Sequence, residues 1–372
     1  MIDTLIGSID LGTVVGLLKM ELMIVLGAVL IWLAIKKKYE PALLLPMGFG
    51  AILANIPFSA AVGPDGPLTV LFRAGISTEL FPLLIFIAIG AMMDFTPLLK
   101  NPYMLLFGAA AQFGIFVTLV VAVLLGFELR VAGAIGIIGA ADGPTSIYVA
   151  NRFAKEFLGP ISVAAYSYMA LVPIIQPPVI RLLTTRQERK IRTDYHAGDV
   201  SKTVKICFPI AITIIAGLVV PQSVALIGFL MFGNLIRESG VLESLSSTAQ
   251  RELGNLVTIL LGLTIASTMT AETFLNAKTL LILGLGLVAF VFDTAGGVLF
   301  AKFMNLFLKK KINPMIGACG ISAFPMSSRV VHQMGQKEDP FNFLLMPASC
   351  VNVGGQIASV VAGGMILALL SN

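Results

Sequence analysis

The sequence predicts an all-α membrane protein that crosses the bilayer several times. Of its 372 residues, 57% are hydrophobic and 12% are charged, whereas a soluble domain of average composition carries about 25% charged residues. Apolar runs of about 20 residues, long enough to cross a bilayer as helices, recur along the chain. They lack the two-residue alternation that strands of a membrane β-barrel require. No polar stretch as long as a domain interrupts them, so we expect the activity inside the membrane or at its surface.

The apolar runs follow one another from the first to the last part of the chain. They cover residues 13–35, 41–62, 68–93, 104–126, 131–153, 159–182, 206–221, 223–236, 255–271, 278–306, 312–334 and 342–370. Their lengths predict about 10–12 helical segments. The three cysteines, Cys207, Cys319 and Cys350, are far apart in or beside these runs. They favour neither a zinc site nor a disulfide framework.

Basic residues gather at positions 36–38, 181–205 and 309–311. By the positive-inside rule, all three clusters belong on the cytoplasmic side. Five apolar runs separate the first cluster from the second, and an odd number of crossings would place the two on opposite faces. At least one run therefore does not cross, and 131–153 is the best candidate because Gly143-Pro144 breaks its helix. Basic patches this small, close to helix ends, make nucleic acid an unexpected partner.

The two halves of the chain contain similar short motifs in the same order. MGFGAILANIP (47–57) resembles LMFGNLIRESG (230–240). GAADGPTS (139–146) aligns with GISAFPMS (320–327) and keeps the spacing of Gly, Pro and Ser. Together the two pairs favour an internal duplication.

Secondary transporters are often built from inverted repeats whose broken helices meet near the membrane midplane. We predict such repeats here. The first would be residues 1–205, which include the N-terminal helix, the basic loop and the broken helix 131–153. The second would be residues 206–372, with the broken helix 312–334.

Four acidic residues stand in or at the ends of apolar runs, namely Glu21, Asp94, Asp142 and Asp293. A carboxylate near the bilayer centre costs several kcal/mol unless it is paired, so each is a candidate functional group. Asp94 lies where its run ends, and a helix cap is the simpler interpretation there. Asp293 is deeper, but no helix break adjoins it, which favours a structural hydrogen bond or ion pair.

Asp142 stands directly beside the predicted break, in GIIGAADGPTSIY (136–148), and Thr145 and Ser146 follow it. Carboxylate and hydroxyl oxygens, together with the carbonyls of an unwound helix, are the ligands that a hard monovalent cation requires. A carboxylate that only caps a half-helix is the structural alternative.

The second broken segment, INPMIGACGISAFPMSSRVV (312–331), contains several groups that could complement the first. It offers an amide, small residues, hydroxyls and a cation, in the order Asn313, Gly317, Gly320, Ser322, Ser327, Ser328 and Arg329. Arg329 stands at the end of its apolar run, where a snorkelling charge is the simplest interpretation.

Two further segments carry polar groups. In AAYSYMALVPIIQPP, Tyr166 and Tyr168 are two residues apart and point in different directions from a helix. One could reach the site while the other anchors at an interface, the commoner role of a membrane tyrosine. In ASCVNVGGQIASVVAGG, Asn352 and Gln356 share a helix face, where close helix packing explains the glycines and the amides could line a cavity.

Five motifs together resemble one family, the membrane β subunits of sodium-pumping, biotin-dependent decarboxylases of oxaloacetate, glutaconyl-CoA, methylmalonyl-CoA and malonate. The motifs are GAADGPTSIY, AAYSYMALVPIIQPP, TTRQERKIR, FGNLIRESGV and KKKINPMIG followed by GISAFPMSSRV. The resemblance covers nearly the whole chain. It implies a subunit of the inner membrane of a prokaryote that decarboxylates carboxybiotin, consumes a proton and exports sodium ions.

The resemblance also assigns residues. It places the essential aspartate of the family at Asp142, its proton-handling tyrosine at Tyr168 and its arginine at Arg329. In the second broken segment, it places functional residues at Asn313, Gly317 and Ser322. It implies one sodium ion at Asp142 and Asn313, and a second near Tyr168 and Ser322. The weaker candidates are Thr145, Asp293, Asn352 and Gln356.

The partners follow from the same resemblance. The sequence contains no biotin-bearing Met-Lys-Met segment, so we expect biotin on a separate carrier subunit. A carboxyltransferase α subunit and a small membrane-anchor subunit complete the expected complex, with a homo-oligomer, a trimer for example, of the chain itself. The basic loop 181–205 would suit the docking of the carrier, although a solvated cytoplasmic loop is equally consistent with its composition.

Two alternatives belong to other classes of protein. A gradient-driven secondary transporter or sodium/proton antiporter would also place an aspartate between crossed broken helices. Fold-level features do not separate it from a decarboxylase subunit. A purely structural membrane subunit would leave the position of Asp142 beside a break unexplained.

Overall fold

The structure, a computed structural model, describes residues 11–38, 41–193, 198 and 200–371. In this part of the chain, all regular secondary structure is helical. Six helices are long and apolar enough to cross a membrane: Val14–Lys37, Pro102–Leu124, Lys155–Leu183, Lys202–Val219, Ala277–Met304 and Leu345–Leu370. The bent pair Pro67–Ile76 and Leu80–Met92 makes a seventh if it counts as one span. The predicted all-α, multi-pass class is confirmed.

The main helices, with their bounds, are α2 (Leu11–Trp32), α3 (Pro41–Asn55), α5 (Leu80–Met92), α7 (Leu105–Ala111), α8 (Phe113–Leu124), α9 (Leu129–Gly136), α10 (Gly143–Phe153), α11 (Leu158–Leu183), α13 (Lys202–Val219), α14 (Val224–Ser239), α16 (Gly254–Ala266), α18 (Ala277–Phe307), α19 (Met326–Glu338) and α20 (Leu345–Leu370). Shorter elements are α4 (Pro67–Leu71), α6 (Thr96–Lys100), α12 (Arg186–Arg189), α15 (Glu243–Thr248), α17 (Ala271–Phe274) and the 3₁₀ segments η4 (Ile137–Ala140) and η8 (Pro314–Gly320).

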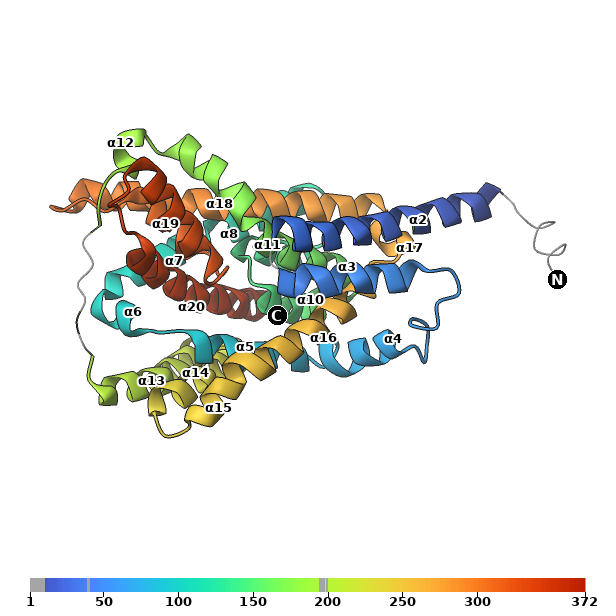
Figure 1. Cartoon of the computed structure of the whole chain (residues 1–372), viewed down its shortest axis with the longest axis horizontal. Coiled ribbons are helices and arrows are strands. Elements are labelled where there is room, and N and C mark those ends of the chain that lie inside the picture. The colour runs from blue at the N-terminus through green and yellow to red at the C-terminus, as the bar shows by residue number, and fades with distance from the viewer. Residues whose placement is uncertain (1–10, 39–40, 194–197, 199, 372) are drawn as a thin grey trace.

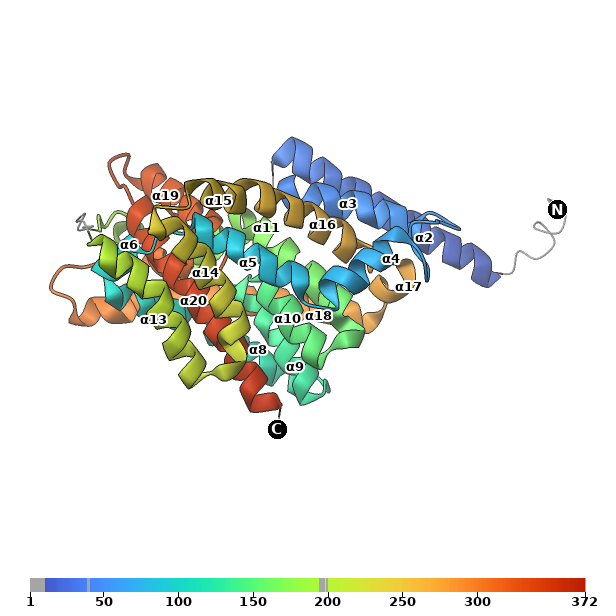
Figure 2. The ribbon, with the colours of Figure 1, turned by 90° about the horizontal axis from the view of Figure 1, so that it is seen from below.

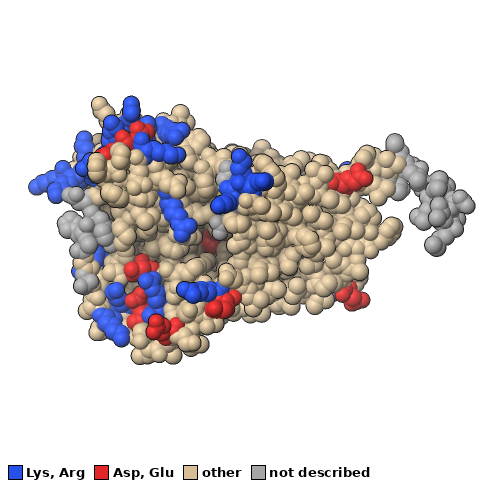
Figure 3. All heavy atoms as spheres, in the orientation of Figure 1, with Lys and Arg blue, Asp and Glu red and all other residues tan. Residues whose placement is uncertain are grey.

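The helices form two groups. In the first, α18 is the central element, and α7, α8, α11, η4 and η8 pack along it, with α20 against α7 and η8. In the second, α5 packs against α14, α13 against α14, and α3 against α2 and α16. Figure 1 shows α4, α5 and α13–α16 along the lower side of the view and α8, α11 and α18 above them. Lys and Arg gather over the left end, where α12, α13 and α19 lie (Figure 3).

The first broken segment is a hairpin, residues 129–153, that enters and leaves at the same end of the bundle. Before it, Phe127 packs edge-on against Phe157, which lies after it, with ring centroids 6.3 Å apart. Glu128 and Glu156 line one hollow with Lys278, at the start of α18. The predicted break is confirmed: Ala141 takes a left-handed φ of 51°, and Asp142 is extended. Pro144, which has no N–H, stands in the first turn of α10, where none is needed.

The second broken segment, residues 313–338, is also a hairpin, and the predicted break there is confirmed. Its inbound half is η8 and its outbound half is α19. The Asn313 side chain donates to the carbonyl of Arg189 at 2.8 Å, and Glu338 forms an ion pair with the Arg189 side chain, also at 2.8 Å. Because both ends of the hairpin meet the same residue, it enters and leaves on one side.

The two hairpins enter from opposite faces. The first opens beside Lys278, whereas α12, where the second opens, is joined to Lys302 through an ion pair of Glu188 at 3.1 Å. Along α18, these two lysines are about 36 Å apart at 1.5 Å per residue, more than the thickness of the hydrocarbon core. Figure 2 shows α9 and α10 on the side away from α19. The tips meet, since the Ser322 N–H donates to the Ala140 carbonyl at 2.9 Å.

The structure differs from the predicted segments at two places. The run 68–93 is not one straight helix but is bent by 64° between Ile76 and Leu80. At the bend, Glu79 has a φ of 65°, and its carboxylate accepts hydrogen bonds from Asn151 and Arg152 at the end of the first hairpin. The run 41–62 forms a helix only over Pro41–Asn55. The relation of the two halves as inverted repeats stays a prediction.

Candidate functional site

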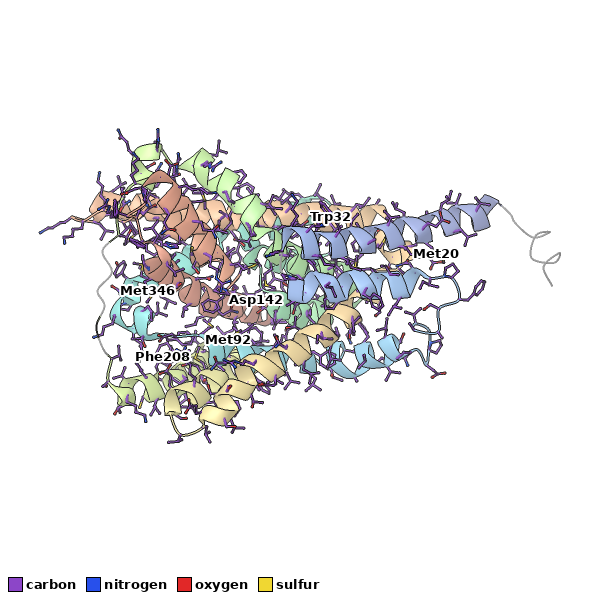
Figure 4. The ribbon with its side chains drawn as sticks, in the orientation of Figure 1. Met20, Trp32, Met92, Asp142, Phe208 and Met346 are labelled. Atoms are coloured by element: carbon purple, nitrogen blue, oxygen red, sulfur yellow. The ribbon has the colours of Figure 1, made fainter. Side chains whose placement is uncertain are left out.

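Asp142 lies at the crossing of the two hairpins and is 2% exposed (Figure 4). One carboxylate oxygen, Oδ1, accepts a hydrogen bond from the Thr145 N–H at 3.1 Å and so caps α10. The capping interpretation is therefore correct for this oxygen. Capping of α10 does not explain the position of the second carboxylate oxygen, Oδ2.

The second oxygen, Oδ2, faces α20. It accepts hydrogen bonds from the Ser359 hydroxyl at 2.7 Å and from the Gln356 side-chain amide at 3.1 Å. A carboxylate has about four acceptor positions. Three are occupied by neutral donors here, so one position remains for a further ligand.

Ser322, at the tip of the second hairpin, is joined to the same group. Its hydroxyl forms a short hydrogen bond with the Ser359 hydroxyl and reaches the Gly355 carbonyl at 3.3 Å. The structure thus brings Asp142, Ser322 and Gln356 together, three residues predicted from different parts of the sequence.

A cavity of about 150 Å³ adjoins these residues. Its wall contains Asp142, Ser322, Gln356, Tyr166 and Thr258, and apolar residues of α3, α5, α11 and α16. The cavity therefore lies between the two groups of helices, the usual place for a small-ligand site. Figure 3 shows the surface hollowed in the part of the view where Figure 4 labels Asp142.

Among the described residues, the cavity wall contains one carboxylate and no basic residue. Burying a lone carboxylate inside a membrane is costly unless a counter-charge is near. The neutral side-chain oxygens around it are of the type that a hard cation binds as ligands. The site thus has the charge and the ligand types for one monovalent cation.

Carbonyls freed at the second break accept hydrogen bonds from side chains. The Ala318 carbonyl accepts from Gln176 at 2.8 Å, and the Gly320 carbonyl accepts from Gln112 at 3.2 Å. Asn352 donates to the carbonyls of Cys319 and Ile321 at 3.2 Å and 2.7 Å. Buried amides from α11, from α20 and from the junction of α7 and α8 therefore replace the missing helical hydrogen bonds. Asn352, a predicted cavity residue, instead holds the backbone of the break.

Asn313 and Gly317 do not line this cavity. The Asn313 side chain caps η8 by accepting from the Met315 N–H at 3.0 Å, and it donates to the carbonyls of Arg189 and Ile191 at 2.8 Å each. At Gly317, an added Cβ would lie 2.0 Å from the Gly297 carbonyl oxygen. These two residues fix the entry of the second hairpin and its contact with α18.

Tyr168 and Arg329 are also outside the cavity wall. The Tyr168 hydroxyl donates to the Leu283 carbonyl on α18. Arg329 is exposed on the first turns of α19. Tyr168 is therefore directed at α18, and Arg329 is exposed at the surface of the described chain.

Asp293 is fully buried and lies close to the first hairpin. Its Oδ1 accepts from the Ile115 N–H at 3.2 Å, whereas Oδ2 has no partner among the described residues. An added Cβ at Gly139 would lie 2.5 Å from that Oδ2. The hydrogen bond agrees with the structural interpretation. The Thr145 hydroxyl is likewise buried without a partner in the described part of the chain.

Sequence reasoning missed Ser359, Gln112 and Gln176. Ser359 follows Asn352 and Gln356 at the spacing of one helix face, so extending that series would have identified it. Gln112 and Gln176 are single amides inside apolar runs, and their polarity was the only feature of the sequence that could have marked them as functional or structural.

Outside the membrane-spanning segments, charged groups close the mouth of the second hairpin. Arg189 and Arg186 pair with Glu338 at 2.8 Å and 3.2 Å, and Arg192 pairs with Asp339 at 2.8 Å. The hydrogen bond from Arg189 lowers the pKa of Glu338 below its usual value. The N–H of Phe341 and the Arg192 side chain lower the pKa of Asp339. Both carboxylates are therefore ionised at neutral pH.

Comparisons with known proteins agree with this arrangement. Residues 19–370 match the family described as the Na⁺-transporting oxaloacetate decarboxylase beta subunit. The chain is 52% identical over 351 residues to a methylmalonyl-CoA decarboxylase subunit beta of Veillonella parvula, covering 94% of this chain and 93% of that protein.

Two other relatives have different substrates in their names. The chain is 51% identical to a glutaconyl-CoA decarboxylase subunit beta of Acidaminococcus fermentans, over 94% of this chain and 92% of that protein. It is 44% identical to an oxaloacetate decarboxylase beta chain of Klebsiella pneumoniae, over 93% and 94% of the two chains.

Proposed function

The chain belongs to the family of beta subunits of Na⁺-transporting decarboxylases, and we propose that it decarboxylates carboxybiotin presented by a separate carrier subunit. Decarboxylation is coupled to sodium export across the inner membrane, in which the chain is a multi-pass subunit. The observation that carries the proposal is the cavity at the crossing of the hairpins, where Asp142 is the one charged group among the described residues of the wall.

The transported sodium ion is proposed to bind beside Asp142. Ser322, Ser359 and Gln356 already contact the carboxylate or each other there, and each has a side-chain oxygen. Because every donor to Asp142 is neutral, a cation that enters the cavity would balance its charge. The two hairpins enter from opposite faces, so each would line one half of the path of the sodium ion through the protein.

Three further residues have proposed roles in the chemistry. When the N–CO₂ bond of carboxybiotin breaks, carbon dioxide leaves and the biotin nitrogen gains a proton. Tyr168 is the proposed source of that proton, and Arg329, which is exposed, would hold the carboxylate before the bond breaks. Thr145 keeps Asp142 oriented through its N–H.

Asn313 and Gly317 are proposed to act by positioning. They hold η8 against the segment 189–191 and against Gly297. A change at either would therefore displace Ser322 at the tip of the hairpin. This proposal replaces the direct ligation of sodium that the family resemblance implies for Asn313.

The remaining partners are also proposals. We propose a carboxyltransferase α subunit and a small membrane-anchor subunit, with the chain itself as a homo-oligomer such as a trimer. The acyl substrate would be selected by the carboxyltransferase. The relatives agree with this division, because beta subunits of similar sequence have different substrates in their names, two CoA esters and one free keto acid.

The test is carbon dioxide release from carboxybiotin by the reconstituted complex, with sodium varied and potassium as the control. Release that requires sodium supports the proposal. No release, together with sodium flux driven by an imposed proton gradient, would instead identify a sodium/proton antiporter.

A further inference from the structure

The helix α11 carries two tyrosines that face different parts of the protein. Side chains two residues apart on an α-helix point about 200° apart. Tyr168 faces α18, where its hydroxyl donates to the Leu283 carbonyl, and an added Cβ at Gly286 would lie 2.8 Å from its ring. Its hydroxyl is therefore occupied by a backbone acceptor.

Tyr166 faces the break in the first hairpin. An added Cβ at Gly143 would lie 2.3 Å from Tyr166 Cζ, the ring atom that bears the hydroxyl. Gly143 directly follows Asp142, and Tyr166 lines the same cavity as Asp142, Ser322 and Gln356. The phenolic oxygen therefore lies beside the proposed sodium site.

The Tyr166 hydroxyl is buried and has no hydrogen-bond partner among the described residues. Buried tyrosine hydroxyls usually find a partner, and a buried polar group without one destabilises the protein. Here the hydroxyl is next to a cavity in which Asp142 is the only charged side chain among the described lining residues. A bound cation would supply the missing partner, because the phenolic oxygen has lone pairs that sodium accepts.

We propose that Tyr166 is a ligand of the sodium ion at Asp142, and that Tyr166, not Tyr168, contributes the phenolic oxygen of that site. The inference rests on the proposed function and refines it. The two tyrosines then have different roles. Tyr166 contributes to the affinity for sodium, and Tyr168 acts in the turnover of carboxybiotin.

The experiment compares Tyr166→Phe with Tyr168→Phe in the complete complex. Each replacement removes one hydroxyl and keeps the ring. For Tyr166→Phe, we expect the sodium concentration at half-maximal decarboxylation to rise about threefold to tenfold, the loss of one such interaction. Turnover at saturating sodium should stay within about twofold. Tyr168→Phe should show the reverse pattern, and Tyr103→Phe, an exposed tyrosine at the end of another helix, should match the wild type.

Three measurements do not depend on activity. Equilibrium binding of ²²Na⁺ to the purified complex should weaken by the same factor in Tyr166→Phe. A sodium-induced change in tyrosine ultraviolet absorption should disappear in Tyr166→Phe and persist in Tyr168→Phe. Because the replaced hydroxyl has no partner among the described residues, the unfolding temperature without sodium should not fall, which makes folding a poor explanation for the effects.

The outcomes separate the inference from the proposed function. If Asp142→Asn abolishes sodium dependence but Tyr166→Phe leaves sodium binding and the absorption change intact, the inference is overturned and the proposed function stands. If Asp142→Asn leaves sodium dependence unchanged, the proposed function fails and the inference fails with it.

Discussion

Asp142→Asn is the most informative substitution, because it removes the charge of the site and keeps its shape. The asparagine Oδ1 can still accept from the Thr145 N–H and cap α10. Its Nδ2 would face the Ser359 hydroxyl and the Gln356 amide, both donors to Oδ2 in the wild type. The hydroxyl can turn to accept and the Gln356 amide can flip, so the hairpin crossing should still form.

The size of the effect follows from the charges around the cavity. Since the described wall of the cavity contains no other charged residue, no other side chain there replaces the attraction that Asp142 exerts on a bound cation. At a separation of about 4 Å and an effective dielectric constant of about 20, that attraction is about 4 kcal/mol. The dissociation constant for sodium should therefore rise about a thousandfold, which abolishes sodium-dependent decarboxylation at ordinary sodium concentrations.

The assay is ²²Na⁺ binding together with sodium-dependent carbon dioxide release, with the unfolding temperature measured in the absence of sodium. Asp94→Asn is the matched control. Asp94 is half-exposed and accepts from the Thr96 N–H at a helix start, so its sodium dependence should equal that of the wild type. Sodium binding by Asp142→Asn within about threefold of the wild type would refute the electrostatic reasoning. Loss of folded protein would show instead that Asp142 is needed mainly as a structural acid.

Three other predictions test the surroundings of the site. Asn352→Leu leaves two buried carbonyls of the second break without donors, so the unfolding free energy should fall by about 2–6 kcal/mol. Unfolding in mixed micelles measures this free energy, and an unchanged value would contradict the role of Asn352 at the break. Asp293→Asn keeps the acceptor for the Ile115 N–H, so sodium-dependent activity should stay near that of the wild type, whereas a strong loss would mark Asp293 as part of the ion path. Arg189 lowers the pKa of Glu338, so the stability that Glu338 contributes is present above its unfolded pKa and lost as the pH falls through the folded value. Limited proteolysis after Arg192, which pairs with the neighbouring Asp339, should therefore speed up on acidification in the wild type. This change should be much smaller in the double variant Glu338→Gln/Asp339→Asn, in which neither carboxylate of the mouth can titrate.

Much of the site could be predicted from local signals in the sequence. Gly143-Pro144 marks a break because a proline cannot donate the hydrogen bond that a helix interior needs. A carboxylate beside that break pointed to Asp142. The odd number of apolar runs between two basic clusters indicated that at least one run does not cross, and the break selected 131–153 as that run.

The rest depends on contacts between distant helices. Nothing local in the sequence shows that Ser359 reaches Asp142, or that Gln112 and Gln176 hold the carbonyls of the second break, because these contacts depend on how α7, α11 and α20 pack. The bend near Glu79 was missed because a left-handed backbone at glutamate has no clear sequence signal. Carbonyls freed by an unwound helix were expected to be unpaired, but at the second break amide side chains already donate to the carbonyls of Ala318, Gly320 and Ile321.

The meeting of the two hairpins also determines how the membrane voltage acts on transport. The tip of the first hairpin lies beside Asp293, near the middle of α18, so an ion at the crossing is about halfway through the voltage drop. Moving one charge across 100 mV costs about 2.3 kcal/mol, and a midway site divides this into two steps of about 1.2 kcal/mol each. The rates of ion uptake and of ion release would then both depend on voltage. Neither step alone would have to move the ion against the full membrane potential.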